Sequence, residues 1–288
     1  MIMNTILESI SGQNLLTENS RSTGFPQLDN LMGGWKPGVS ILSARPGMGL
    51  TAFALTQVSQ ILSNLKEHEV VIYVADKESS TALMHRLLSV ATQIDLARIQ
   101  NGKLNKEEYD KVLKNPLTRQ LKNNTLVFLN SNTPTVYAIR KLVHSLKKEG
   151  KKPVMAFVDS LQSLVDRIRF RSHEMEQVML DLDLFSEEYE MPVVCTMPLG
   201  RSLEYRDSKY PRLSDLDAKM VNIARSVFFL LRPEYYELID LPEEEAGEAH
   251  LIVAKNEGPL DTLKFTLNRK SLTFTERAPN LFPNLTIL

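Results

Sequence analysis

Residues 39–55 read VSILSARPGMGLTAFAL, in which an apolar run of strand length leads through a turn with two glycines into a helical pattern. This order is typical of a phosphate-binding loop, because the backbone N–H groups of such a turn and the N-terminus of the following helix both favour an anion. The general form of the loop ends Gly-Lys-Thr, whereas this one ends Gly49–Leu50–Thr51. Glycine turns between strands and helices are common, so the stretch alone leaves a nucleotide site and a purely structural turn both open.

Apolar runs of strand length alternate with helical patterns beyond this loop. The expected strands cover 39–43, 70–75, 125–130, 154–159 and 193–197, and the expected helices cover 51–65, 80–92, 136–148 and 174–189. Continuous apolar strands separated by helices predict an α/β fold with a mostly parallel sheet flanked by helices. Further runs of strand length cover 227–231, 250–254, 263–267 and 272–275. The last three follow one another closely, which predicts antiparallel strands at one edge of the sheet.

The chain divides into three parts. Residues 1–20 are expected to form an amphipathic helix and a linker, because their apolar residues recur at helical spacing before a polar stretch. Residues 21–277 contain the alternating pattern and form the expected α/β domain, in which the acidic run 234–248 is predicted to be a long surface loop. Residues 278–288 are a tail that is apolar enough to cover the surface of its own domain.

The composition excludes several classes of protein. With 34 Lys and Arg against 35 Asp and Glu, the net charge of −1 provides no overall attraction to nucleic acid or to a membrane, so any DNA contact must be local. The single cysteine, Cys195, excludes an internal disulfide, and its apolar surroundings predict a buried, inert thiol. No apolar run approaches the roughly 20 residues that cross a bilayer, and the first residues lack the basic start and continuous apolar run by which a signal peptide is predicted. We therefore expect a cytoplasmic protein without membrane contacts, and the scattered histidines predict no structural metal.

Short motifs in a fixed order between Thr23 and Glu276 are similar to those of the C-terminal ATPase domain of DnaB-type replicative DNA helicases. They are Thr23–Gly24–Phe25, Gly34–Trp35–Lys36–Pro37, Ala44–Arg45–Pro46, Val158–Asp159–Ser160–Leu161–Gln162, Arg201–Ser202–Leu203–Glu204, Ser214–Asp215–Leu216 and Arg232–Pro233–Glu234–Tyr235–Tyr236. The resemblance implies a RecA-like P-loop NTPase core that forms hexameric rings around single-stranded DNA, with nucleotide between subunits. It also implies that the N-terminal domain that engages primase is missing, and that the helix within 1–20 docks on a neighbouring subunit or on its own domain.

The resemblance implies a nucleotide site at the glycine loop. Its residues are Arg45, Pro46, Gly47, Met48, Gly49, Leu50, Thr51 and Asp159. Thr51 and Asp159 are the expected ligands of a weakly held Mg²⁺, although they are equally compatible with a helix N-terminal residue and a strand-end cap. We expect ATP or ADP to bind weakly with Mg²⁺, and we expect no other cofactor.

Four positions that carry the chemistry in this family differ here. By the family pattern, Leu50 takes the place of the loop lysine, Lys77 that of the general base, Pro198 that of a glutamine that senses the γ-phosphate, and Asn256–Glu257 that of the arginine finger. Losing a charged partner of a phosphate removes roughly 1.5–3 kcal/mol of binding, and a finger is worth about 10³–10⁵ in rate. No catalytic residue is therefore expected, unless a shift of one position lets Asp76 or Glu78 act as the base.

A basic segment follows the fifth strand. Arg201, Arg206, Lys209 and Arg212 lie where the family's DNA-gripping loops begin, and they are the expected DNA contacts if the segment is more than a solvated surface. Asp217 stands where a family arginine is expected, and a carboxylate facing phosphate opposes binding.

Three functions are compatible with these residues. The first is a catalytically inactive relative of DnaB, a pseudoenzyme that acts in replication or recombination by binding an intact helicase, its own copies or single-stranded DNA. The second is a divergent ATP-dependent helicase that uses Asp76 or Glu78 and an unrecognised cation in place of Leu50. The third is a binding module in which ATP promotes assembly without being hydrolysed.

Overall fold

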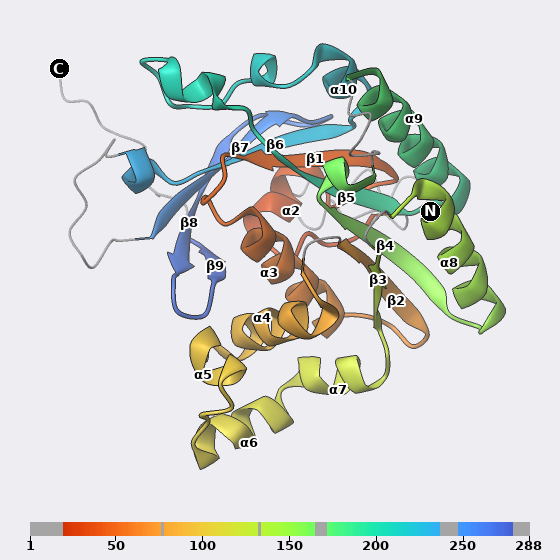
Figure 1. Ribbon diagram of the computed structural model, residues 1–288, viewed down its shortest axis with the longest axis vertical. Helices are drawn as coiled ribbons and strands as arrows, with labels where there is room; N and C mark the ends of the chain where they lie inside the picture. The colour runs from red at the N-terminus through yellow and green to blue at the C-terminus, as the bar shows by residue number, and fades with distance from the viewer. Residues whose placement is uncertain (1–19, 76–77, 132–133, 165–171, 237–246, 279–288) are drawn as a thin grey trace, which may run out of the picture.

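A computed structural model of the chain describes residues 20–75, 78–131, 134–164, 172–236 and 247–278. In these residues nine strands form one sheet in the order β3-β2-β4-β5-β1-β6-β7-β8-β9, which runs through the middle of the molecule (Figure 1). The strands are β1 (Gly38–Ala44), β2 (Glu69–Ala75), β3 (Leu126–Asn130), β4 (Lys152–Asp159), β5 (Pro192–Pro198), β6 (Ser226–Leu231), β7 (Glu248–Lys255), β8 (Thr262–Asn268) and β9 (Thr273–Glu276).

The sheet is parallel in one part and antiparallel in the other. Strands β3, β2, β4, β5, β1 and β6 pair in parallel, and β7, β8 and β9 then add antiparallel to β6. The predicted α/β class, with antiparallel strands at one edge, is thus confirmed. Parallel pairing brings the carboxyl ends of β1, β2, β4 and β5 to one edge, which is where ligands bind in open α/β sheets.

Helices cover both faces of the sheet. Those that belong to the two cores described next are α2 (Pro26–Met32), α3 (Leu50–Ser63), α4 (Ser80–Thr92), α8 (Val136–Lys148), α9 (Ser172–Tyr189) and α10 (Ala218–Ile223). One apolar core joins the sheet to α2, α3 and α4, and a second joins it to α8, α9 and α10. Strand β2 contributes to both, because Val71 and Tyr73 face the first core whereas Val70, Ile72 and Val74 face the second.

Three short helices between α4 and β3 were not predicted. They are α5 (Leu96–Gln100), α6 (Lys106–Lys114) and α7 (Pro116–Lys122), and they lie beyond α4, away from the sheet (Figure 1). No residue of α6 is buried, and its apolar residues Tyr109, Val112 and Leu113 span little more than one turn, which is too short a pattern to identify a helix in a sequence. The sequence nonetheless contains a signal for the start of α6, because Asn105 and Glu108 form a capping box.

Several expectations fall outside the described residues, and one is wrong. The first 19 residues, Asp76, Lys77 and almost all of the tail lie outside them. The acidic run 234–248 was predicted to be a surface loop, but its last residue, Glu248, is buried at the start of β7. There it contacts His250 at 2.7 Å and Arg277 at 2.9 Å, because a buried carboxylate requires such partners. Cys195 is buried in β5 as expected, and this burial raises the pKa of its thiol.

Candidate nucleotide site

The glycine loop joins β1 to α3 in a conformation that requires its glycines. Gly47 and Gly49 have φ angles of 90° and 92°, in the region that favours glycine. A Cβ atom on Gly47 would lie 3.3 Å from the ring of Tyr235, and one on Gly49 would lie 3.0 Å from the ring of Phe274. Conformation and packing therefore both exclude larger residues from these two positions.

Met48 has a different role from its neighbours. Arg45, Pro46, Gly47, Gly49, Leu50 and Thr51 line the cleft beside the loop. Met48 is only 1% exposed, and its Sδ accepts a hydrogen bond from the backbone N–H of Arg232 at 3.4 Å. Its side chain therefore anchors the loop in the core, and it is not part of the cleft lining.

The N-terminus of α3 is open toward the cleft. Helix α3 begins at Leu50, and no side chain caps it at Gly49. The first N–H groups of a helix have no partner within the helix, so an anion can accept hydrogen bonds from them. The loop thus retains the geometry of a phosphate site, although the side chain of Leu50 packs against the apolar core and supplies no charge.

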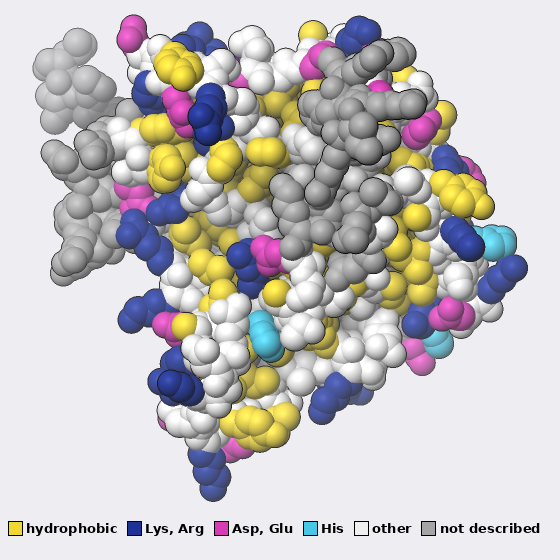
Figure 2. Space-filling view, viewed as in Figure 1, with side chains coloured by type: hydrophobic (Ala, Val, Ile, Leu, Met, Phe, Trp, Pro, Cys, Tyr) yellow, Lys and Arg dark blue, Asp and Glu magenta, His cyan; other side chains and the backbone are white. Residues whose placement is uncertain are grey.

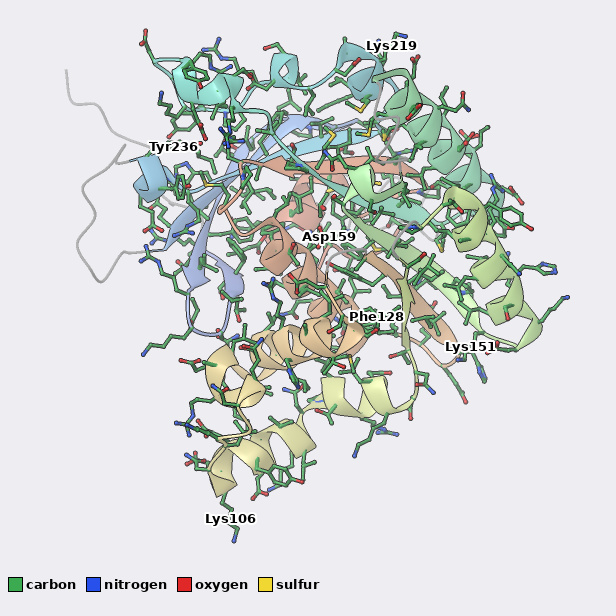
Figure 3. All side chains as sticks on the ribbon, viewed as in Figure 1. Lys106, Phe128, Lys151, Asp159, Lys219 and Tyr236 are labelled. Carbon is green, nitrogen blue, oxygen red and sulfur yellow. The ribbon has the colours of Figure 1, made fainter. Side chains whose placement is uncertain are left out.

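The cleft has a volume of about 500 Å³ and reaches the carboxyl ends of the neighbouring strands. Besides the loop, it is lined by the strand-end residues Ala75, Asp159, Ser160, Thr196 and Pro198, and by Glu78, Leu83 and Arg86. Asp159 ends β4 near the centre of the molecule (Figure 3). Asp159 and the glycine loop therefore line the same cleft, and nucleotide binding there stays a prediction.

Two hydroxyl groups hold the carboxylate of Asp159. Tyr73 on β2 donates to Oδ2 at 2.9 Å, and Thr196 on β5 donates to Oδ1 at 2.5 Å. Burial, followed by the adjacent carboxylate of Asp159, raises the pKa of Tyr73 well above its usual value, so the phenol remains a donor. Neither hydroxyl was identified from the sequence, because strand pairing alone brings these three side chains together.

Among the described residues, two cations line the cleft, Arg45 and Arg86. Arg45 is already engaged, because its guanidinium donates to the carbonyl of Leu199 at 2.6 Å and to the carboxylate of Glu204 at 3.0 Å. Arg86, on α4, forms an ion pair with Glu78 at 3.2 Å. Glu78, one of the three residues considered for the general base, lines the cleft, whereas Asp76 and Lys77 lie outside the described residues.

An acidic residue braces the outer side of the loop. Glu234 accepts hydrogen bonds from Arg232 Nε at 3.0 Å and from the backbone N–H of Gly247 at 2.7 Å, and it pairs with Arg269 at 2.8 Å. These partners hold the pKa of Glu234 below its usual value despite the opposing effect of desolvation. Arg232 also donates to the carbonyl of Gly47 at 3.2 Å, so this group fixes the loop from outside.

The charged side chains at the end of β7 and just after it bind partners within the chain. Lys255 donates to the carbonyls of Val221 at 2.6 Å and Ala224 at 2.5 Å, where α10 ends. Glu257 pairs with Arg225 at 2.7 Å and with Lys36 at 3.4 Å, and these cations lower the pKa of Glu257 although desolvation opposes them. The predicted finger position therefore presents an acidic side chain, and the cations around it are paired.

The four basic residues after β5 divide into two kinds. Arg206 pairs with Asp215 at 2.7 Å and Lys209 donates to the carbonyl of Glu204 at 2.8 Å, so both hold the segment together. Arg201 and Arg212 are exposed. Figure 2 shows basic, acidic and hydrophobic side chains intermixed over this segment at the upper left. The structure thus leaves Arg201 and Arg212 as the accessible cations among the four.

The chain was compared with known protein families and sequences. The model of the DnaB-like helicase C-terminal domain matches residues 21–276. A probable replicative DNA helicase of Trieres chinensis is 33% identical over 259 residues, which are 86% of this chain and 55% of that protein. The replicative DNA helicase DnaB of Helicobacter pylori strain J99 is 31% identical over 273 residues, with the same two coverages. The chain thus spans about half the length of these curated relatives.

Solved structures resemble the fold. One of them, an ATPase domain solved by itself, matches with a TM-score of 0.81 at 24% identity, covering 96% of this chain and 98% of that chain. A structure of a DnaB-like replicative helicase, which describes its interactions with primase, matches with a TM-score of 0.79 at 24% identity over 95% of this chain and 65% of that one. In the described residues, no helix is long and apolar enough to span a membrane.

Proposed function

Because this chain belongs to the family of DnaB-like helicase C-terminal domains, we propose that it binds nucleotide weakly, does not hydrolyse ATP and acts through its contacts with helicase subunits. The observation that carries the proposal is Leu50, an apolar side chain at the one loop position where a cation would meet the phosphates. Without this cation the loop provides backbone hydrogen bonds and little of the charge stabilisation on which phosphoryl transfer depends.

The residues of the cleft fit a nucleotide with Mg²⁺ only in part. The open N-terminus of α3 and the two glycines suit a polyphosphate, and Thr51 and Asp159 suit the coordination shell of a magnesium ion. ATP supplies the phosphoanhydride bond, and Mg²⁺ would neutralise part of the phosphate charge. Tyr73 and Thr196 orient Asp159, whose oxygens have further lone pairs for a metal-bound water. Weak binding of ATP or ADP follows.

The residues around the end of β7, where the arginine finger is expected, also support the absence of hydrolysis. An arginine finger must reach into the site of the next subunit, yet Glu257 offers a carboxylate there and is tied to Arg225 and Lys36. Lys255 is the nearest alternative cation in sequence, but it caps the end of α10. A ring made of this chain alone would therefore lack both the loop cation and the finger at every interface.

ATP turnover by the purified protein tests the proposal. We expect no release of phosphate above background, with or without single-stranded DNA. Asp159→Ala is the matched control, because it disrupts the strand end and leaves the loop intact. Turnover that disappears in this variant would contradict the proposal.

A second function, that of a divergent ATPase, is favoured by one observation. Glu78 lines the cleft and pairs with Arg86, so a carboxylate is present near the place where a general base would act. If this function is correct, turnover is measurable and Glu78→Gln abolishes it. The leading proposal instead expects both proteins to be equally inactive.

We also propose the partners. They are an intact DnaB-type helicase or further copies of this chain, together with single-stranded DNA at the exposed Arg201 and Arg212. Light scattering of the protein alone, and of its mixture with a DnaB-type helicase from the same cell, tests the first part. Only monomers in both samples would contradict it.

A further inference from the structure

The cleft contains a cation that does not come from the glycine loop. Of the two arginines that line it, Arg45 is turned toward Leu199 and Glu204 and is held there by both. Arg86 comes from α4, and its side chain is 27% exposed. Because Arg45 is held by two partners within the chain, Arg86 is, among the described residues that line the cleft, the cation that can respond to a phosphate.

Glu78 competes for this cation. Its carboxylate lies 3.2 Å from Nε of Arg86, and its side chain is 32% exposed. An ion pair that is partly open to water is weak, so a ligand with several negative charges can displace the carboxylate. Glu78 thus binds Arg86 when no phosphate is present, and a bound phosphate can displace it.

The same pair lies within electrostatic reach of the strand-end aspartate. Glu78, Arg86 and Asp159 line the same cleft, and Tyr73 donates a hydrogen bond to Asp159 there. The charges of Glu78 and Arg86 therefore act on the part of the cleft where the phosphates and their metal ion would lie.

We propose that Arg86 replaces the loop lysine as the cation for the terminal phosphates of a bound nucleotide, and that Glu78 holds Arg86 until phosphate displaces it. This inference rests on the proposed nucleotide binding. The ion pair limits the affinity of the site for nucleotide, because part of the free energy of phosphate binding is used to break the pair. The ligand class is a nucleoside di- or triphosphate, or inorganic pyrophosphate in its place.

The test is a double-mutant cycle read by calorimetry with adenylyl imidodiphosphate, ADP and pyrophosphate in the presence of Mg²⁺. We expect Arg86→Ala to weaken the binding of all three by about tenfold or more, because a charged hydrogen-bonding partner is removed. Glu78→Gln has the opposite effect and tightens binding about two- to fivefold, since it removes the competing charge of an exposed pair. On the Arg86→Ala background, Glu78→Gln has no effect.

The controls separate this inference from the proposed function. Arg98→Ala breaks another ion pair, that with Glu108 between α5 and α6, and leaves affinity unchanged. Arg86→Lys keeps the charge and retains most of the binding, and circular dichroism with thermal unfolding shows whether each variant folds.

Two results would overturn the inference while nucleotide binding stands. One is unchanged affinity in folded Arg86→Ala, and the other is tightening by Glu78→Gln that persists without Arg86, because Glu78 would then repel phosphate directly. If the wild-type protein binds none of the probes, the inference and the proposed nucleotide binding fail together. Measurable turnover with reduced affinity in Arg86→Ala would contradict the proposed inactivity and support the inference.

Discussion

Among single residues, Leu50 offers the simplest test of the nucleotide site. Leu50→Lys restores a cation at the start of α3, where it can meet a bound phosphate. We expect the affinity for ADP to rise by about 10- to 100-fold, which corresponds to the roughly 1.5–3 kcal/mol of a charged hydrogen bond. Isothermal titration calorimetry measures this change.

Leu50→Met is the matched control for the lysine variant. It keeps an apolar side chain of similar volume against the core, so affinity and stability remain close to those of the wild type. Leu50→Lys is nevertheless expected to stay inactive in ATP hydrolysis, because Glu257 still occupies the finger position. Robust turnover in this variant would show that the finger segment is not limiting.

Tyr73 is the second residue whose role can be isolated. Tyr73→Phe removes the hydroxyl that donates to Asp159 but keeps the ring, which stacks on Phe157 with the centroids 6.2 Å apart. We expect the free energy of unfolding to fall by roughly 1.5–3 kcal/mol at neutral pH, because the variant lacks a buried hydrogen bond to a charged group. Urea unfolding followed by circular dichroism measures the difference.

The pH dependence of this difference has a defined sign. The pKa of Tyr73 is raised in the folded protein, so above the ordinary tyrosine pKa of about 10 the unfolded chain loses a proton that the folded chain keeps. The wild type therefore loses stability as pH rises through this range, whereas Tyr73→Phe does not lose this contribution. The difference in free energy of unfolding between the wild type and Tyr73→Phe should become smaller above about pH 10, and a constant difference would contradict the assigned hydrogen bond.

The sequence predicted the loop half of the site but not its far side. Gly47, Gly49 and Leu50 were identified because a loop of fixed pattern carries them and its context is local. Tyr73, Thr196 and Arg86 were missed because they come from three separate elements, and only strand register and the packing of α4 bring them to the cleft. Met48 was assigned to the nucleotide contacts because the pattern does not show which loop side chain turns into the core.

At the scale of elements, the segment between β5 and α10 combines bracing residues with free ones. Arg206 and Lys209 hold the segment together, and Arg201 and Arg212 remain exposed. We expect the double variant Arg201→Ala, Arg212→Ala to bind single-stranded DNA more weakly and with a smaller salt dependence, by roughly one unit of slope for each phosphate that the variant no longer neutralises. Fluorescence anisotropy over a range of salt concentrations measures both quantities.

A bracing residue provides the comparison for this prediction. Arg206→Ala leaves Asp215 without its partner, so it disturbs the segment and should lower thermal stability as well as affinity. The double variant should change affinity alone. If the affinity of the double variant for DNA equals that of the wild type, the segment is a solvated surface and does not contact DNA.

The elements themselves were predictable wherever burial imposes a pattern. Strands such as β2 and β5 are continuous apolar runs because helices cover both faces, and the close spacing after β6 predicted the antiparallel edge. Helices α5, α6 and α7 were missed because they are short and carry little buried surface, so any apolar periodicity in their sequence covers only one or two turns. The buried Glu248 was missed because an acidic run suggests a loop, and its partner Arg277 lies far along the chain.

At the scale of the whole molecule, the two faces of this domain predict how it would act inside a ring. A subunit in a ring has one neighbour on each side, and the proposed function expects each nucleotide site to lie between neighbours. An inserted copy of this chain would provide a defective loop to one interface, through Leu50, and no finger to the other, through Glu257. Each insertion would therefore disable two interfaces.

Adding this chain to an intact DnaB-type helicase should thus lower the DNA-stimulated ATP turnover of that helicase. The decrease should be about twice as steep as with a copy of the helicase in which only the loop lysine is replaced, because such a copy still supplies a finger. Glu257→Ala in this chain should not relieve the inhibition, since removing the acid does not create a finger. Light scattering on the same mixtures reports whether mixed rings form. Mixed rings with unchanged turnover would contradict the inference that both faces are defective, and separate species would show that the chain acts outside the ring.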